Sequence, residues 1–282
     1  MTFLVTTVTA NAPVGRFIVE HLLDLGRKVR TLSLDPASAN LPPADILAGD
    51  LGDARGIKAA LHGVEAVFLP AVVRGFAKTF LAAAREAGVR RIVFQSSGAV
   101  GQDNRIGAIH AGLEQQIRAS GLEWTFLRLA IGSGDPLQWA FDVPGQLAAG
   151  DVVRGPYARA ATSPVHPADL AAAVVACLTA PEHAGQIYDV TGPASLTHAE
   201  QITLIGQVLG RPLTYEELEP PVARRAISPH APADVLFADW EEHLDVPAHL
   251  TATLQHLIDR PLHSPTAWAA DLASRLRSAG AW

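Results

Sequence analysis

The first 130 residues alternate between short apolar or β-branched runs and segments whose apolar residues recur at helical spacing, and this alternation most constrains the fold. Strands are predicted at Phe3–Val8, Lys28–Leu34, Asp45–Ala48, Ala66–Leu69, Arg91–Gln95 and Thr125–Leu129. Helices are predicted between them at Val14–Leu25, Ala54–Leu61, Phe76–Ala87 and Ile109–Ser120. Because strands joined through helices run parallel, the pattern predicts an α/β fold with a Rossmann-type, doubly wound parallel sheet.

The remainder of the chain has shorter segments and more proline. It predicts strands at Asp151–Arg154 and Ile187–Val190 and helices at Pro167–Leu178, His198–Leu209 and Pro247–Leu257. We therefore expect a Rossmann-type, NAD(P)-binding-like core over residues 1–130 and a smaller C-terminal α+β substrate-binding region over residues 131–282, interleaved with the sheet edge. Glu216–Pro232 is predicted to be a surface connection and the most mobile segment.

The charge and cysteine content exclude several classes of protein. With 22 basic and 28 acidic residues, the formal charge of −6 provides no basic field for nucleic acid. A single cysteine, Cys177, excludes an intrachain disulfide. No signal peptide or membrane-spanning run is recognisable, so a cytoplasmic location without membrane association is expected. The C-terminal histidines lack neighbouring cysteines or clustered carboxylates, so no metal site is expected.

The first strand-to-helix turn is poor in glycine. A dinucleotide-binding turn uses glycines for a tight bend and for close approach of the backbone to the pyrophosphate, but Gly15 is the only glycine in Thr7–Gly15. The sequence therefore predicts either no cofactor or weakly bound NAD(P)H. If NAD(P)H binds, the candidate contacts are Thr7, Thr9, Asn11, Ala12, Val14, Gly15, Asp35 and Asp50.

Polar residues at the end of one strand and on the next helix are candidates for chemistry. Ser97 follows the strand Arg91–Gln95, where its hydroxyl is placed to polarise a substrate oxygen or to cap a turn. His110 and Glu114 are four residues apart and share a helix face. The carboxylate is expected to orient the imidazole for proton transfer, although such a pair is also typical of a solvated helix face. Ser97, His110 and Glu114 are the predicted catalytic residues.

A second group is predicted to line a substrate pocket, with plain core packing or helix capping as the alternatives. It comprises Ser96, Trp139, Phe141, Asp142 and His166.

Several segments together resemble the NmrA-like family of atypical short-chain dehydrogenases/reductases, and the resemblance spans nearly the whole chain. They include Val14-Gly15-Arg16, Gly63–Phe68, Ala87–Val93 leading to Ser96-Ser97, Ser120–Thr125, Leu127-Arg128, Pro167–Ala171 and Gly185–Tyr188. This resemblance implies a Rossmann-type domain with a small substrate region. It also implies NAD(P)H binding and activity on quinones, carbonyls or other small molecules, or redox sensing without catalysis.

The chain departs from that family at important positions. The tyrosine and lysine of the classical reductase pair correspond to Ile106 and His110, and Leu34 stands where NADP-preferring relatives often carry a basic residue. The loss of the tyrosine alone is not decisive, whereas the glycine-poor turn acts on cofactor binding itself. The leading hypothesis is therefore a non-redox enzyme that converts a small, largely apolar substrate by acid/base chemistry of the isomerase, cyclase, dehydratase or lyase type. The alternatives are an NAD(P)H-dependent reductase of a quinone or carbonyl compound and a non-catalytic sensor. A small-molecule substrate is the expected partner, and a homodimer is left open.

Overall fold

The computed structural model describes residues 1–6, 13–33, 44–49, 53–70, 77–134 and 140–278. The chain forms two compact units, each assembled from more than one stretch of sequence. The first contains Met1–Leu129, Pro167–Asp189 and Leu257–Asp259, and the second contains Ala130–His166, Val190–His256 and Arg260–Trp282.

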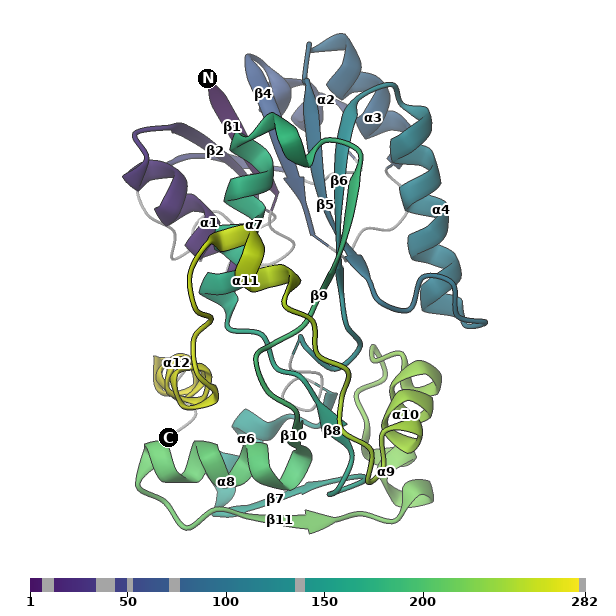
Figure 1. The fold of residues 1–282 in the computed structure, drawn as a ribbon, viewed down its shortest axis with the longest axis vertical. Coiled ribbons are helices and arrows are strands. Elements are labelled where there is room, and N and C mark those ends of the chain that lie inside the picture. The colour runs from purple at the N-terminus through teal and green to yellow at the C-terminus, as the bar shows by residue number, and fades with distance from the viewer. Residues whose placement is uncertain (7–12, 34–43, 50–52, 71–76, 135–139, 279–282) are drawn as a thin grey trace. The chain divides into compact units, whose positions relative to one another are not determined.

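The first unit is built on a seven-stranded sheet with the strand order β3-β2-β1-β4-β5-β6-β9 (Figure 1). The pairings from β3 through to β6 are all parallel, which confirms the predicted Rossmann-type fold class. The inner strands are continuous apolar runs because helices cover both of their faces. The strands are β1 (Thr2–Thr6), β2 (Lys28–Ser33), β3 (Asp45–Ala48), β4 (Val64–Leu69), β5 (Arg91–Ser97), β6 (Glu123–Leu129) and β9 (Gln186–Val190).

Helices flank this sheet on both sides. Helices α2 (Ala54–Leu61), α3 (Ala77–Glu86) and α4 (Arg105–Ala119) pack in sequence along one face, where Ile57, Phe80 and Leu113 join a single apolar core with the strands. Helices α1 (Pro13–Asp24) and α7 (Pro167–Thr179) pack against each other at the other face.

The start of α4 is fixed by a cap and by a close backbone contact. Asn104 is extended and its Oδ1 accepts a hydrogen bond from the amide of Gly107 at 2.8 Å, so it caps the helix. A Cβ atom on Gly107 would overlap the carbonyl oxygen of Ala99, in the turn that follows β5. Gly107 therefore lets the helix begin directly against this turn, which sets the position of every side chain on α4 relative to β5.

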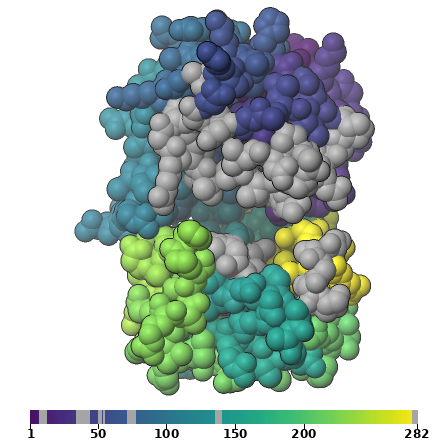
Figure 2. Space-filling model, turned by 180° about the vertical axis from the view of Figure 1, so that it is seen from behind, coloured from purple at the N-terminus to yellow at the C-terminus, as the bar shows by residue number. Residues whose placement is uncertain are grey.

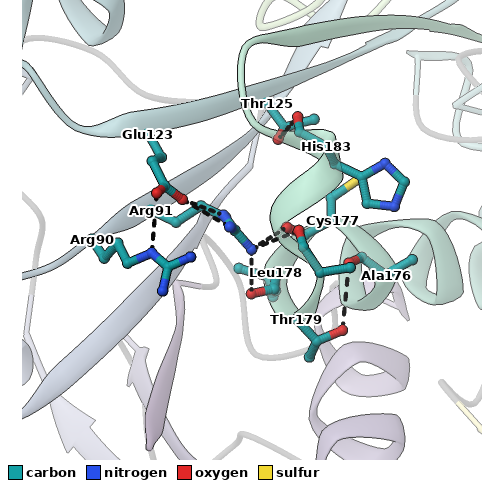
Figure 3. Close-up of polar contacts among 10 residues, drawn as sticks. Arg90, Arg91, Glu123, Thr125, Ala176, Cys177, Leu178, Thr179 and His183 are labelled. Carbon is teal, nitrogen blue, oxygen red and sulfur yellow. Dashed lines mark hydrogen bonds and ion pairs between the residues drawn. The ribbon is translucent and has the colours of Figure 1, made fainter.

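At the opposite edge of the sheet, a buried arginine ties β5 and β6 to α7 (Figure 3). The guanidinium of Arg91 contacts Glu123 through Nε at 3.1 Å and through Nη2 at 2.8 Å. Its Nη1 donates to the carbonyl oxygens of Cys177, Leu178 and Ala180 at 3.3, 3.2 and 2.8 Å. Arg91 thus satisfies carbonyl groups that the end of a helix leaves without partners.

The second unit has its own apolar core, which includes the buried Trp240 and Trp268. Figure 2 shows teal, green and yellow surface together in this unit, because it combines segments that are far apart in the sequence. Strand β7 pairs in parallel with β11, and β8 pairs antiparallel with β10. The elements are α6 (Val143–Ala149), β7 (Val152–Gly155), β8 (Ala161–Thr162), β10 (Leu196–Thr197), α8 (His198–Leu209), β11 (Thr214–Glu217), α9 (Pro220–Ala226), α10 (Ala233–Glu242) and α12 (Pro265–Ser278). Helix α11 (Thr253–Ile258) belongs to this unit up to His256 and to the first unit from Leu257, and the short 3-10 helix η1 (Pro181–His183) belongs to the first unit.

Two predictions for the C-terminal half are wrong. The helix predicted at Pro247–Leu257 starts only at Thr253, because the amides of Ala248 and Thr251 donate instead to the hydroxyls of Ser195 and Thr191, each at 2.9 Å. The segment Glu216–Pro232 is not simply a connection, since it contains the end of β11 and all of α9. Helices α10 and α12 were not predicted.

Candidate active site

A cluster of polar side chains lies where β5 and β6 end and α4 packs over them. Ser96 and Ser97 are the last residues of β5, and Ser96 is the register partner of Arg128 on β6. His110 and Glu114 lie on the buried side of α4. The carboxyl edge of a parallel sheet is where ligands bind in doubly wound folds, so this cluster stands in the expected position for a site.

Glu114 is the hub of the cluster. It is only 3% exposed, and its Oε1 accepts hydrogen bonds from Ser96 Oγ at 2.7 Å and from Arg128 Nε at 3.0 Å. Its Oε2 accepts from Arg128 Nη2 at 2.8 Å and lies 3.6 Å from Arg118 Nη2. Burial raises the pKa of Glu114, but the hydrogen bonds and positive charges around it outweigh burial and lower the pKa overall. Glu114 is therefore an anion at neutral pH.

His110 is buried beside this carboxylate and stacks on Phe94, with ring centroids 5.8 Å apart. Its Nδ1 lies 3.5 Å from Ser96 Oγ, while no direct hydrogen bond joins His110 to Glu114. Burial lowers the pKa of His110, and the charge of Glu114 offsets only part of this effect. The imidazole is thus mainly neutral at pH 7, and it meets Glu114 through Ser96 instead of contacting the carboxylate directly.

Ser97 has a local role as well as a candidate chemical one. Its Oγ accepts a hydrogen bond from the amide of Ala99 at 3.1 Å, which stabilises the turn after β5. The hydroxyl hydrogen is still available to donate to another group. The assignment of Ser97 as a group that polarises a substrate oxygen stays a prediction.

The structure describes part of the predicted cofactor site. Val14 and buried Gly15 lie in the first turn of α1, whereas Thr7, Thr9, Asn11, Ala12, Asp35 and Asp50 fall outside the described residues. Thr6 Oγ1 donates to the carbonyl of Phe68 at 2.8 Å, which joins the ends of β1 and β4. The sheet order reverses between these two strands, and such a switch point is where dinucleotides bind beside a helix N-terminus. The described residues therefore fit a dinucleotide at this switch point.

The other predicted pocket residues, apart from Ser96, belong to the second unit or are not described. Phe141 is buried against Trp240 at a centroid distance of 6.1 Å, and Asp142 caps α6 by accepting from the amide of Gly145 at 3.2 Å. His166 is buried and stacks on His263 at 4.0 Å. Trp139 lies outside the described residues. Phe141 and Asp142 thus have structural roles here, and the pocket assignment of these residues stays a prediction.

Sequence reasoning missed the part played by Arg128. Its side chain, which is 22% exposed, holds both oxygens of Glu114, and these contacts raise its own pKa. A signal was present in the sequence, because an arginine within an otherwise apolar strand requires an anionic partner. The strand pattern alone did not show that this partner lies on α4.

Together, the doubly wound sheet, the strand-order switch and the polar cluster at its carboxyl edge define a protein with a Rossmann-type fold. A family model described as NAD(P)H-binding matches residues 10–181, and the chain belongs to this family.

Relatives and solved structures agree with this assignment. The chain is 34% identical over 281 residues to the (4-alkanoyl-5-oxo-2,5-dihydrofuran-3-yl)methyl phosphate reductase of Streptomyces griseus, covering 96% of this chain and 98% of that one. It is 29% identical to the NAD(P)H azoreductase of Xenophilus azovorans, over 80% of each chain. The Citrobacter sp. triphenylmethane reductase complexed with NADP(H) shares the fold, with a TM-score of 0.74, 18% identity and coverage of 96% and 99%.

These findings confirm the resemblance to NmrA-like atypical reductases. They favour the reductase alternative over the non-redox hypothesis, which gains no support from them. Within the described ranges, no group of three or more metal-ligating side chains could hold a metal ion. None of the described helices combines the length and apolar character that a membrane span requires.

Proposed function

We propose that this protein is an NAD(P)H-dependent reductase of a small, electron-poor conjugated carbonyl compound. The observation that carries the proposal is its near full-length similarity to a reductase whose named substrate is an alkanoyl-dihydrofuranone carrying a methyl phosphate group. Membership of the NAD(P)H-binding family supports the cofactor. The glycine-poor first turn then implies looser contact with the pyrophosphate, not loss of the cofactor.

The cofactor would be held at the first strand-to-helix turn and the start of α1. Val14 and Gly15 provide the helix N-terminus, whose backbone amides favour a pyrophosphate, and the predicted contacts also include Thr9, Asn11 and Asp35. When bound, NAD(P)H supplies the hydride.

The polar cluster supplies the proton side of the reaction. Hydride addition to a conjugated carbonyl leaves negative charge on the carbonyl oxygen, and the hydroxyl of Ser97 is the donor proposed to stabilise it. His110 is the proposed proton donor, and anionic Glu114 favours the imidazolium that this step consumes. Since burial lowers the pKa of His110, proton donation is favoured at mildly acidic pH.

The proposal is tested by cofactor binding and turnover with the purified full-length chain. NADPH and NADH are titrated by nicotinamide fluorescence and calorimetry. An alkanoyl-dihydrofuranone phosphate, its dephosphorylated form and a simple quinone are then offered as substrates. We expect cofactor oxidation matched by a product that carries the elements of one added hydrogen molecule.

Two outcomes would redirect the proposal. Absence of cofactor binding at millimolar concentration would refute the reductase and return the non-redox acid/base enzyme to first place. Cofactor binding without turnover on any of these substrates would favour the sensor alternative.

A further inference from the structure

We propose that Ser96 and Arg128 are positioning residues that decide which nitrogen of His110 exchanges a proton, fixing Nδ1 as the hydrogen-bonded nitrogen and leaving Nε2 as the reacting one. This inference deepens the proposed function, because it rests on His110 being the proton donor of the reductase.

Glu114 can only accept hydrogen bonds. Arg128 holds its two oxygens from Nε and Nη2 at 3.0 and 2.8 Å, and Arg118 adds a second positive charge at 3.6 Å. A carboxylate held in a forked contact by a guanidinium stays ionised and offers no hydrogen. Arg128 therefore sets the direction of every hydrogen bond that reaches Glu114.

The Ser96 hydroxyl has a single hydrogen to donate. Since Ser96 Oγ lies 2.7 Å from Glu114 Oε1, its hydrogen is committed to the carboxylate. Only a lone pair of Oγ then faces His110 Nδ1, at 3.5 Å, so Nδ1 must carry a hydrogen if the two bond. The contact is long, as is common for such bonds before a ligand is bound.

The other nitrogen of the His110 ring is Nε2. The ring is held by stacking on Phe94 and by the fixed start of α4 at Gly107. Nε2 of His110 has no hydrogen-bond partner among the described residues. A neutral ring with hydrogen on Nδ1 presents a bare Nε2, which is the atom that gains and then donates a proton.

The charged groups around the hydrogen-bonded series Glu114–Ser96–His110 come from three elements. Glu114 and Arg118 lie on α4, and Arg128 lies on β6. Asp189 on β9 acts electrostatically on Arg128. Glu114 is the one of these that favours protonation of His110, through its charge.

The test is nitrogen NMR of the isotope-labelled full-length protein across pH, with His110→Gln identifying the His110 signal among the 11 histidines. In the unsubstituted protein we expect neutral His110 to carry its hydrogen on Nδ1. Ser96→Ala should shift the hydrogen toward Nε2 while changing no charge. Glu114→Gln should lower the His110 pKa further, because the neighbouring anion is gone, and Glu114→Asp should restore part of it. Arg128→Lys should keep the tautomer better than Arg128→Gln.

The matched control is Glu123→Gln. It removes a carboxylate that, like Glu114, is paired with an arginine, but at the other end of β6 (Figure 3). It should leave the His110 signals unchanged. Hydrogen on Nε2 in the unsubstituted protein, or a tautomer unaffected by Ser96→Ala, would overturn the inference. Because these signals are read in the free protein, a failed reductase assay does not affect them, and the two proposals can fail separately.

Discussion

Ser96 and Arg128 are partners in the β5–β6 register, and both donate a hydrogen bond to the same oxygen of Glu114. Two neighbouring strands thus converge on one carboxylate of the helix above them. The cluster is held by long-range pairing as well as by the local geometry of α4.

Replacing His110 should affect chemistry more than folding. His110→Gln is expected to lower kcat by about 10²-fold or more, the usual contribution of a general acid, while cofactor affinity stays similar. In the unsubstituted protein, kcat/KM should rise as pH falls through the His110 pKa, which burial lowers, because the imidazolium is the proposed proton donor. The variant should lack this pH dependence. Steady-state kinetics from pH 5 to 8, with circular dichroism as a folding control, measure both effects; an unchanged profile would contradict the role.

Two glycines of α4 form a matched pair. Gly107→Ala places a methyl group against the carbonyl of Ala99 and should cost about 1 to 3 kcal/mol of unfolding free energy, with a loss of activity as α4 shifts. Gly112→Ala meets nothing within 4 Å and should stabilise the helix by up to about 1 kcal/mol. Urea unfolding of both variants checks the difference, and equal effects would show that the contact at Gly107 is unimportant.

Arg91 should matter for stability and not for turnover. Arg91→Met removes the donor to three carbonyl oxygens and to Glu123, so we expect a loss of about 2 to 4 kcal/mol in unfolding free energy. If the proposed reductase activity holds, turnover measured well below the melting temperature should remain close to that of the unsubstituted protein. A stable variant with lost turnover would place Arg91 in the reaction.

His198 should make the protein sensitive to acid. It is buried at the start of α8, where its Nδ1 donates to the Pro156 carbonyl at 3.1 Å, and burial lowers its pKa to about 4. The unfolded chain binds a proton near pH 6.5, so stability is complete above that pH and declines as pH falls toward 4, by about 3 kcal/mol in total. His198→Gln should flatten this decline. Urea midpoints at several pH values measure it, and parallel curves would contradict the assignment.

The first unit was predictable because its signals are local and repeated. Uninterrupted apolar strands separated by helices at periodic spacing lead directly to the parallel sheet, and the spacing of His110 and Glu114 places them on one helix face. The sequence does not reveal that Ser96 lies between them or that Arg128 holds the carboxylate, because both contacts depend on strand register. The predicted domain boundary at residue 130 likewise assigns Pro167–Asp189 to the C-terminal region, although this segment belongs to the first unit.

The second unit offered weaker signals. Helix α10 begins after Pro232 without a side-chain cap, so no start signal marks it. Helix α12 did have one, since Ser264 Oγ accepts from the amide of Ala267 at 3.2 Å and Pro265 opens the helix. Its buried residues Trp268, Leu272 and Leu276 also recur at helical spacing. The sequence therefore contained the usual signals of a helix at α12, although this helix was not predicted.

The packing of α7 against the sheet affects how the chain folds during synthesis. During synthesis the strands up to β6 emerge before α7, so the apolar surface of α1, β4 and β5 that this helix covers has no partner until Thr179 has left the ribosome. A fragment ending at Leu129 would keep that surface permanently uncovered. Residues 1–129 are therefore not expected to fold stably alone, and a chain that ends between Leu129 and Pro167 should aggregate.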